Sequence, residues 1–449
     1  VVMAGTLAAT GDYTAYSGSV LANLGESGGV RTFTKNGAGT VTLSGANTYT
    51  GATSVNGGTL ALDFSAAGAP TDNIINSATN SSALNLGSTV GWNWSSYWLS
   101  GSLEVTGADG AANTQRFNGL TLAQNSFGTV RLDAGGGGTL ALNVGALTRN
   151  GGSTVDFDLS AGASFATSTG TAGSLLVGGQ SQAYATVGGD TWALKDAGNA
   201  YVTGAEPGFY TPSTATTLTG HANLTGGDTT LAASTGISTL RLGDDAARTL
   251  DLNGKTLTVN NGAILVADTV ATAGSRIVGG SLTSGATNNS GRDLIVHQHS
   301  EESFEVASAI VNNGSDPIRL YKSGAGELLL SGANAFSGST TVSGGTLTVG
   351  SGAALGSASN TLNITGGASV NLNGFDLTVG SLYGIGAIDN LSGQDVTLTL
   401  GAGNGDSTFA GTIQDSNGVL SIAKTGSGTL TLSGSNTYSG DTTVGAGTL

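Results

Sequence analysis

The 449-residue sequence predicts an all-β solenoid, a fold in which coils of short strands stack along one axis. Glycine supplies 77 residues and charged residues only 10%, whereas average soluble domains contain about 7% glycine and about 25% charged residues. Short apolar runs alternate with Thr and Ser, as in strands with one buried face. One 26-residue motif also occurs three times without a gap, and repetition at this scale predicts a repeat architecture.

The composition excludes several other classes of protein. Collagen needs Gly at every third position and abundant proline, but the glycines here lack that period and there are only 4 prolines. Disorder is disfavoured because 38% of the residues are hydrophobic. The chain contains no cysteine, so disulfides and thiolate metal sites cannot stabilise it.

The charge balance and hydropathy limit the partners of the chain. Fourteen Lys and Arg against 29 Asp and Glu give a net charge of −15, which disfavours binding to nucleic acid or to an anionic membrane. No apolar run approaches the roughly 20 residues of a membrane span. The first residues lack the charged start of a signal peptide, so we expect a piece of a longer exported chain with no transmembrane segment.

The three copies of the motif define the expected core. They read KNGAGTVTLSGANTYTGATSVNGGTL, KSGAGELLLSGANAFSGSTTVSGGTL and KTGSGTLTLSGSNTYSGDTTVGAGTL, and they span Lys35–Leu60, Lys322–Leu347 and Lys424–Leu449. In each copy, aliphatic residues alternate with polar residues, so the aliphatic ones should share one buried face. The residues expected in the core are Val41, Leu43, Val55, Leu60, Leu328, Leu330, Val342 and Leu347.

Each copy also carries a turn and one aromatic ring. Ser44-Gly-Ala-Asn47 has turn composition, and the ring is Tyr49, Phe336 or Tyr438. If equivalent coils stack, the rings and the asparagines would form ladders along the axis. A lead-in segment precedes each copy, and Asp251–Val259 recurs as Asn371–Val379 with an Asn-Gly corner.

This pattern resembles the passenger-associated transport repeat of autotransporters, also called the autotransporter-associated β-strand repeat. The ungapped matches cover 78 of the 449 residues. The resemblance implies a right-handed parallel β-helix that is exported across a Gram-negative outer membrane and displayed on the bacterial surface. We divide the chain into a first repeat at 1–62, a divergent stretch with longer loops at 63–249, and the second and third repeats at 250–449, all in one continuous solenoid.

Enzymes with this fold use clustered carboxylates in a groove. The sequence offers only three close acidic pairs, Asp244-Asp245, Glu301-Glu302 and Asp156/Asp158. We interpret them as solvated charges and expect no catalytic residue, no cofactor and no enzyme activity.

Two other groups of residues have chemistry that could bind a ligand. His297 and His299 are two residues apart, so on one strand both would face the same side, which is a weak metal-binding pattern without a third ligand. Trp92, Trp94, Tyr97 and Trp98 form the densest aromatic cluster, which could stack on a sugar or pack as a loop over the solenoid. We favour exposed polar side chains for the first group and packing for the second.

Three glycine-rich segments are interpreted as turns. Gly135–Gly138 lacks the Lys-Ser/Thr and the helix of a phosphate loop. Gly226-Gly-Asp228 and Gly403-Asn-Gly-Asp406 are isolated, whereas calcium-binding repeats occur in tandem. We expect no calcium site.

The sequence therefore predicts a structural stalk of a cell-surface or secreted fibre or adhesin. The alternative is a carbohydrate-binding or carbohydrate-active β-helix that uses the region of Trp92–Trp98. The last copy ends at Leu449, where the first two copies continue, so we expect either a longer chain or end-to-end association. A glycan or a cell-surface molecule is the expected partner.

Overall fold

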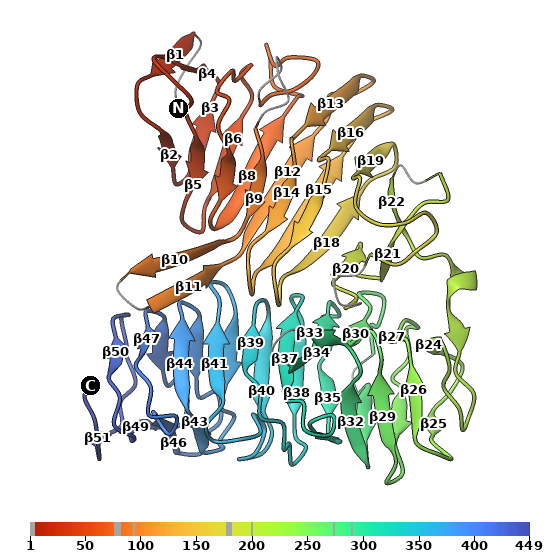
Figure 1. Ribbon diagram of the computed structural model, residues 1–449, viewed down its shortest axis with the longest axis vertical. Coiled ribbons are helices and arrows are strands. Elements are labelled where there is room, and N and C mark those ends of the chain that lie inside the picture. The colour runs from red at the N-terminus through yellow and green to blue at the C-terminus, as the bar shows by residue number, and fades with distance from the viewer. Residues whose placement is uncertain are drawn as a thin grey trace.

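The chain folds into two β-solenoids that lie side by side (Figure 1). The computed structural model describes residues 5–75, 82–92, 95–176, 182–198, 201–272, 274–288 and 291–449. We call residues 5–204 arm 1 and residues 211–449 arm 2. Residues 205–210 connect the arms and contain one 3₁₀ turn, η1 (Pro207–Phe209).

Arm 1 has three faces, and each coil contributes a strand or an extended segment to each face. The long sheet contains β3 (Gly18–Val20), β6 (Thr40–Leu43), β8 (Gly58–Asp63), β12 (Gly101–Thr106), β15 (Phe127–Asp133), β18 (Thr154–Leu159), β20 (Ala185–Val187), β21 (Thr191–Lys195) and β22 (Val202–Gly204). The second face contains β2 (Tyr13–Ala15), β5 (Phe33–Lys35), β7 (Thr53–Val55), β9 (Leu84–Leu86), β14 (Leu120–Leu122) and β17 (Leu147–Arg149). The third face contains β1 (Thr6–Ala9), β4 (Asn23–Glu26), β13 (Ala112–Arg116), β16 (Thr139–Asn143) and β19 (Ala163–Ala166). The hairpin β10 (Ser88–Trp92) and β11 (Ser95–Leu99) is inserted after β9.

Arm 2 repeats this plan. Its long sheet contains β23 (Thr211–Pro212), β24 (His221–Leu224), β27 (Thr239–Leu242), β30 (Ala263–Val266), β34 (Gly291–Gln298), β37 (Ile318–Ser323), β39 (Thr340–Val342), β41 (Thr361–Ile364), β44 (Ser381–Gly384), β47 (Ser407–Phe409) and β50 (Leu430–Leu432), with β33 (Thr287–Asn288) paired to β34. The second face contains β25 (Thr229–Thr230), β28 (Thr249–Asp251), β31 (Arg276–Val278), β35 (Phe304–Val306), β38 (Glu327–Leu330), β40 (Thr346–Val349), β42 (Ser369–Asn371), β45 (Ala387–Asp389) and β48 (Thr412–Gln414). The third face contains β26 (Thr235–Ile237), β29 (Thr256–Val259), β32 (Ser281–Ser284) and β36 (Ala309–Ile310), and then β43 (Leu377–Val379), β46 (Val396–Leu400), β49 (Leu420–Lys424) and β51 (Thr442–Val444).

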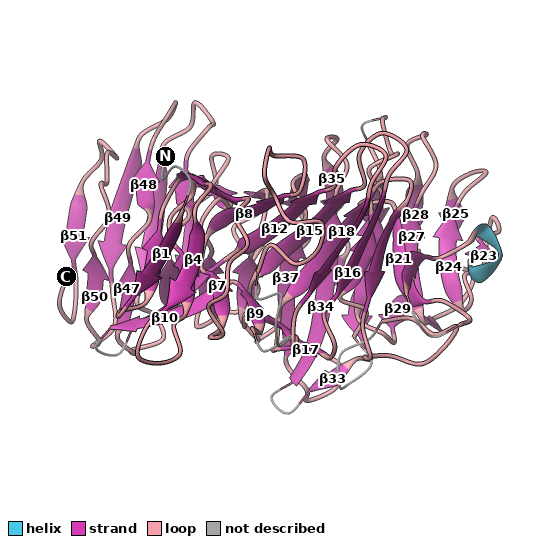
Figure 2. Cartoon of the chain, turned by 90° about the horizontal axis from the view of Figure 1, so that it is seen from above, coloured by secondary structure: helices cyan, strands magenta, loops and turns pink. Residues whose placement is uncertain are grey.

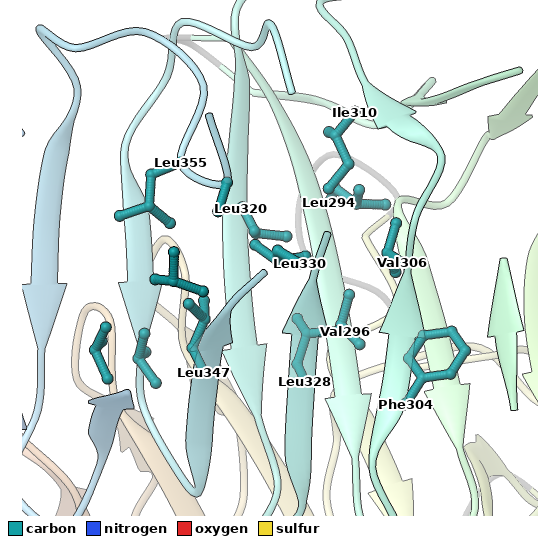
Figure 3. Packing of buried hydrophobic residues seen from close by; sticks show 14 of the residues in the cluster. Leu294, Val296, Phe304, Val306, Ile310, Leu320, Leu328, Leu330, Leu347 and Leu355 are labelled. Atoms are coloured by element: carbon teal, nitrogen blue, oxygen red, sulfur yellow. The ribbon is translucent and has the colours of Figure 1, made fainter. Parts of the chain in front are cut away.

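The pairing between coils is parallel, so the all-β solenoid expected from the sequence is confirmed. Val41 pairs with Leu60 in the first repeat, and Leu328 pairs with Leu347 at the equivalent positions of the second. Alternation places aliphatic side chains inside, as the burial of every second residue of β12 illustrates. All eight residues expected in the core are at most 1% exposed, and Figure 3 shows such side chains meeting from different strands inside arm 2.

Coil length varies along the chain. Lys35 pairs with Val55, Lys322 with Val342 and Lys424 with Val444, so the step from one coil to the next is the same in all three repeats. The step from Leu103 to its partner Val130, in the middle of arm 1, is longer. The repeats therefore form short coils of constant length, and arm 1 accommodates longer loops between them.

The ladders of paired strands do not run through the whole chain as one stack. Within the described residues, β22 pairs with β21 and β23 pairs with β24, but no ladder joins β22 to β23. Strands β20, β21 and β22 pair antiparallel, which interrupts the parallel stack at that end of arm 1. The buried apolar residues form two clusters, one inside arm 2 and one that joins the core of arm 1 to the outer face of the long sheet of arm 2. The expectation of a single continuous solenoid is replaced by two solenoids.

The two arms run in opposite directions along their shared interface (Figures 1 and 2). Strand β11 lies against β44, Gly152 lies against Tyr321, and Asp190 contacts Arg241. Early coils of arm 1 thus meet late coils of arm 2. The chain forms a hairpin of solenoids with its bend at residues 205–210.

The long sheet of arm 2 is buried on both faces where it meets arm 1. Ile264 and Val296 point into the core of arm 2, whereas Leu265, Ile295 and Tyr321 belong to the cluster of arm 1. Strand β30 is buried at all four positions. Two-sided burial explains the uninterrupted apolar runs of β30 and β34, since strands covered on both faces lose the alternation of polar and apolar residues.

The two Asn-Gly corners adopt the same conformation. Asn253 and Asn373 have φ values of 48° and 49°, a left-handed region that asparagine tolerates better than most residues. The side chain two positions earlier accepts a hydrogen bond from each backbone N–H, Asp251 at 2.7 Å and Asn371 at 2.9 Å. The second recurring element therefore encodes a defined turn between two faces.

Candidate functional site

The lysine that opens each repeat binds three backbone carbonyls. Lys35 Nζ donates to the carbonyls of Asn36, Gly37 and Gly57 at 3.0, 2.6 and 2.7 Å. The same arrangement recurs in the other two copies. There Lys322 binds Ser323, Gly324 and Gly344, and Lys424 binds Thr425, Gly426 and Ala446.

Each of these ammonium groups has three donors and uses all of them. Two carbonyls belong to the adjoining turn and the third belongs to the next coil, 22 residues further along the chain. The lysine therefore links consecutive coils. Burial lowers the pKa of Lys322 to about 7, while nearby Glu327 favours the charged form.

The asparagine of each repeat links its coil to the preceding coil. Asn47 Oδ1 accepts from the Leu24 N–H at 2.9 Å, and Asn334 Oδ1 accepts from the Ile310 N–H at 2.8 Å. Asn436 Oδ1 accepts from the Ile413 N–H at 2.9 Å. The amide nitrogens donate to carbonyls of the turn or of the next coil, as Asn47 does to Ile74. The asparagine thus satisfies the N–H of a strand residue of the preceding coil, in β4, β36 or β48.

A side-chain carboxylate or amide that precedes each repeat accepts a hydrogen bond from a backbone N–H of that repeat. Glu26 Oε2 accepts from the Thr50 N–H at 3.0 Å, and Asp415 Oδ2 accepts from the Ser439 N–H at 2.8 Å. In the second copy Asn312 Oδ1 accepts from the Ser337 N–H at 3.0 Å. These residues could not be recognised from the repeat alone, because the three equivalent positions hold three different amino acids, Glu, Asn and Asp. Their nearly constant spacing before the repeat residue that they bind is the signal that could have identified them.

The aromatic rings of the three copies do not form a ladder. Tyr49 contacts Phe33 and Tyr13, at ring-centroid distances of 6.0 and 6.1 Å. Its hydroxyl bonds to Thr53 Oγ1. The copies lie in separate coils, with their lysines on β5, β37 and β49. The rings of the three copies are therefore too far apart to stack on one another. The prediction of a ladder of equivalent rings is wrong.

His297 and His299 lie at the interface between the arms. The His297 ring is fully buried, and its Nε2 is 3.3 Å from the Ala183 carbonyl of arm 1. His299 Nε2 is 3.3 Å from Thr186 Oγ1, also in arm 1. The two rings are stacked with centroids 6.3 Å apart. Burial lowers the pKa of His297 to about 3 and also lowers that of His299.

The acidic pairs do not converge on a common groove within the described residues. Asp156 is buried and accepts from Thr186 Oγ1 at 2.6 Å, whereas Asp158 is exposed beside Arg131. Asp244 forms an ion pair with Arg248 at 2.5 Å. Glu302 contributes its backbone carbonyl to Gln298 at 2.5 Å. The carboxylates of Asp156 and Asp244 are therefore engaged with the fold, and that of Asp158 is exposed.

The aromatic cluster lies on the inserted hairpin of β10 and β11. Trp94 falls outside the described residues, and for Trp92, Tyr97 and Trp98 the structure describes the backbone only. The antiparallel register pairs Val90 with Tyr97 and Trp92 with Ser95. The hairpin lies against β44 (Figure 1), so the segment reaches from arm 1 to arm 2.

The glycine-rich segments form turns between coils. Gly135 and Gly136 border an open hollow of 470 Å³ with Asp109 and Asp133. Asp109 Oδ1 accepts from the Gly136 N–H at 2.6 Å, and Asp133 Oδ1 accepts from the Gly135 N–H at 3.1 Å. Both carboxylates therefore bind backbone amides of the loop.

The described residues contain no group of three or more His, Cys, Asp or Glu side chains arranged to hold a metal ion. None of their helices is long and apolar enough to cross a membrane.

Comparison with known proteins agrees with the repeat pattern. A family model described as the passenger-associated transport repeat matches residues 33–62, 320–349 and 422–449. The Adhesin BmaC autotransporter of Brucella suis biovar 1 (strain 1330) is 33% identical over 426 residues, which cover 89% of this chain. The chain spans only 11% of the length of that relative. No solved structure matches the chain. Three segments of the chain are therefore passenger-associated transport repeats, and 89% of the chain is similar to part of an autotransporter adhesin.

Proposed function

We propose that this chain is a rigid stalk segment of an adhesin passenger displayed on the bacterial surface. The observation that carries the proposal is the pair of solenoids packed along their length. Each solenoid satisfies its backbone between coils, so its length can grow without a larger core. Packing the arms together gives a double-width body that resists bending more than one solenoid does.

Three details of the repeats support a mechanical role. The lysine, the asparagine and the lead-in acid or amide each join one coil to another through backbone hydrogen bonds. Such links resist separation of the coils and leave the outer surface free to vary. The carboxylates of Asp156 and Asp244 are engaged with the fold, which favours a structural role over hydrolysis of a glycan.

The relative is an autotransporter adhesin, which suggests a role in adhesion, and export to the surface is part of the same proposal. We expect the passenger to cross the outer membrane and to contact a glycan or a protein on another cell. Any direct contact by this segment would be made through the hairpin β10–β11 or the loops, since the sheets are needed for stacking.

Electron microscopy and cell binding test this proposal together. Purified chain should form stiff particles of uniform shape and should bind host cells or matrix weakly. Within the full passenger, deleting whole coils between repeats should shorten the particle and reduce adhesion without changing the ligand. Flexible particles would contradict the stalk, and turnover of a polysaccharide that is lost on substitution of the exposed Asp158 (Asp158→Asn) would favour the carbohydrate-active alternative.

A further inference from the structure

All three histidines of the chain lie at the junction of the two arms. His297 and His299 are on and just after β34, at the interface with arm 1. His221 lies on β24, and its ring centroid is 4.2 Å from that of Phe209 in the connector. Histidine is the side chain whose ordinary pKa lies closest to neutral pH. The groups that titrate most readily are thus concentrated where the arms meet.

The surroundings of the stacked pair favour neutral rings. Trp192 of arm 1 packs edge-on to His297 with centroids 5.5 Å apart, and Phe127 of arm 1 packs against His299 at 6.2 Å. Ser323 Oγ lies 3.0 Å from His297 Nδ1. A proton on either ring would place a charge among aromatic groups and away from water, which is costly.

The charged groups around the pair are mixed. Arg149 of arm 1 and Lys322 of arm 2 oppose protonation of His297, and Lys322 also opposes that of His299. Asp156 and Asp268 favour the charged form of His299, but burial outweighs them. Asp156 is further engaged by Thr186 and by the Gly189 N–H.

The contacts between the arms are both apolar and polar, and Ala263, Leu265, Ile295 and Tyr321 of arm 2 pack into the cluster of arm 1. Arg241 pairs with Asp190 at 2.7 Å, the Ala183 N–H donates to the Asn261 carbonyl at 3.1 Å, and the Asp268 N–H donates to the Gly189 carbonyl at 3.0 Å. No strand ladder crosses between the arms in the part of the chain that the structure describes. Separation of the arms at residues 205–210 would therefore break no strand ladder, and it would uncover the arm 2 side chains that pack into the cluster of arm 1.

We propose that the arm interface is an acid-sensitive latch: protonation of His297 and His299 separates the two arms and exposes the outer face of the long sheet of arm 2. That face carries Leu265, Ile295 and Tyr321, which arm 1 covers in the closed form. The inference goes beyond the stalk function, because it makes the width and reach of the segment depend on pH.

The sign of the effect follows from proton linkage. In the open form the rings are hydrated, and their pKa returns to about 6.5. Below that pH the open form binds more protons than the closed form, so the stability of the closed form is complete above about pH 6.5 and declines as the pH falls. Because His297 is fully buried, it shifts the equilibrium toward the open form by roughly tenfold per pH unit until the pKa of the closed form is reached, and the half-buried His299 adds a smaller shift.

Small-angle X-ray scattering and circular dichroism of the whole chain at pH 7.5 and 5.0 test the latch. The radius of gyration should rise at pH 5.0 while the β-sheet signal stays constant. His297→Gln with His299→Gln should remove the rise. An unchanged radius in the native protein would overturn the proposal, as would a rise with loss of the β-sheet signal or a Gln variant that still expands.

A disulfide across the arms provides a test that keeps the native histidines. Ser100 Oγ and Thr365 Oγ1 lie 3.5 Å apart on opposite arms, and the chain has no other cysteine. In Ser100→Cys with Thr365→Cys, the oxidised protein should keep its radius at pH 5.0 and the reduced protein should expand. Equal expansion in both forms would show that the arms do not separate, whatever the Gln variant does.

Discussion

The hydroxyl of Tyr49 lies 2.8 Å from Oγ1 of Thr53, four residues further along the first repeat. Tyr438 and Thr442 form the same pair at 2.8 Å in the third repeat. The second repeat has Phe336 at the tyrosine position and keeps Thr340 at the other. Thr340 Oγ1 is buried and has no hydrogen-bond partner among the described residues. The second repeat thus retains half of a polar pair.

Restoring the missing hydroxyl should stabilise arm 2. Phe336→Tyr places an O–H where the other two repeats have one, and a satisfied buried hydroxyl is worth about 1 kcal/mol. We expect a higher midpoint of urea unfolding for arm 2. Tyr49→Phe is the matched control and should lower the stability of arm 1 by a similar amount, and a loss of stability in Phe336→Tyr would contradict the pairing.

Removing the buried lysine should weaken the second repeat more than the third. Lys322→Met keeps the length of the side chain but leaves the carbonyls of Ser323, Gly324 and Gly344 without their donor, at a cost of about 2–4 kcal/mol. Lys424→Met should cost less, since the coil around Lys424 is largely exposed. Hydrogen exchange of the adjoining turns measures both effects, and equal protection in the two variants would argue against burial as the cause.

The contact between Gly152 and Tyr321 should control the packing of the arms. An added Cβ at Gly152 would lie 2.2 Å from Cε1 of Tyr321 and 2.4 Å from Asn125 Oδ1, at a φ of +76°. Gly152→Ala should therefore loosen the interface by about 1–3 kcal/mol. Limited proteolysis of the connector reports on the packing.

Combining Gly152→Ala with Tyr321→Ala distinguishes steric crowding by the ring from backbone strain at residue 152. Tyr321→Ala removes the ring, so adding Gly152→Ala should then cost less than it does alone. Additive effects in the double variant would mean that the left-handed backbone at residue 152, and not the ring, sets the cost.

A charge in the core should disrupt coils locally. Leu43 is 0% exposed, and Leu43→Asp would bury a carboxylate without a partner, which costs several kcal/mol. Because each coil contacts mainly its neighbours, amide protection should fall near β3, β6 and β8 and persist in arm 2. Uniform loss of protection across both arms would contradict nearest-neighbour coupling.

The features that could be predicted from the sequence are those that depend on neighbouring residues. The alternation around Val41 and the turn at Asn47 depend on residues within one or two coils. The hairpin of solenoids depends on contacts between positions such as Asp190 and Arg241, 51 residues apart, or Ser100 and Thr365, 265 residues apart. No short pattern encodes these contacts. One signal was available, since the uninterrupted apolar run Ala263–Val266 indicates a strand covered on both faces.

The histidines show the same limit. Their spacing predicted that both rings share one side of a strand, but the identity of that side depends on arm 1. The sequence does not show that Trp192 and Thr186 of arm 1 contact these rings, so His297 and His299 were interpreted as exposed polar residues. His297 is fully buried and His299 is half-buried, which corrects that interpretation.

The lysines of the second and third repeats point to a last consequence. Lys322 lies on the long sheet of arm 2, and Lys424 lies on its third face. The interval between them is not a whole number of turns, so the second repeat and the third are rotated relative to each other about the axis of the arm. Loops inserted at equivalent points of the second and third repeats would therefore project from different faces of the arm. Phasing of this kind distributes the insertions over more than one face of the arm.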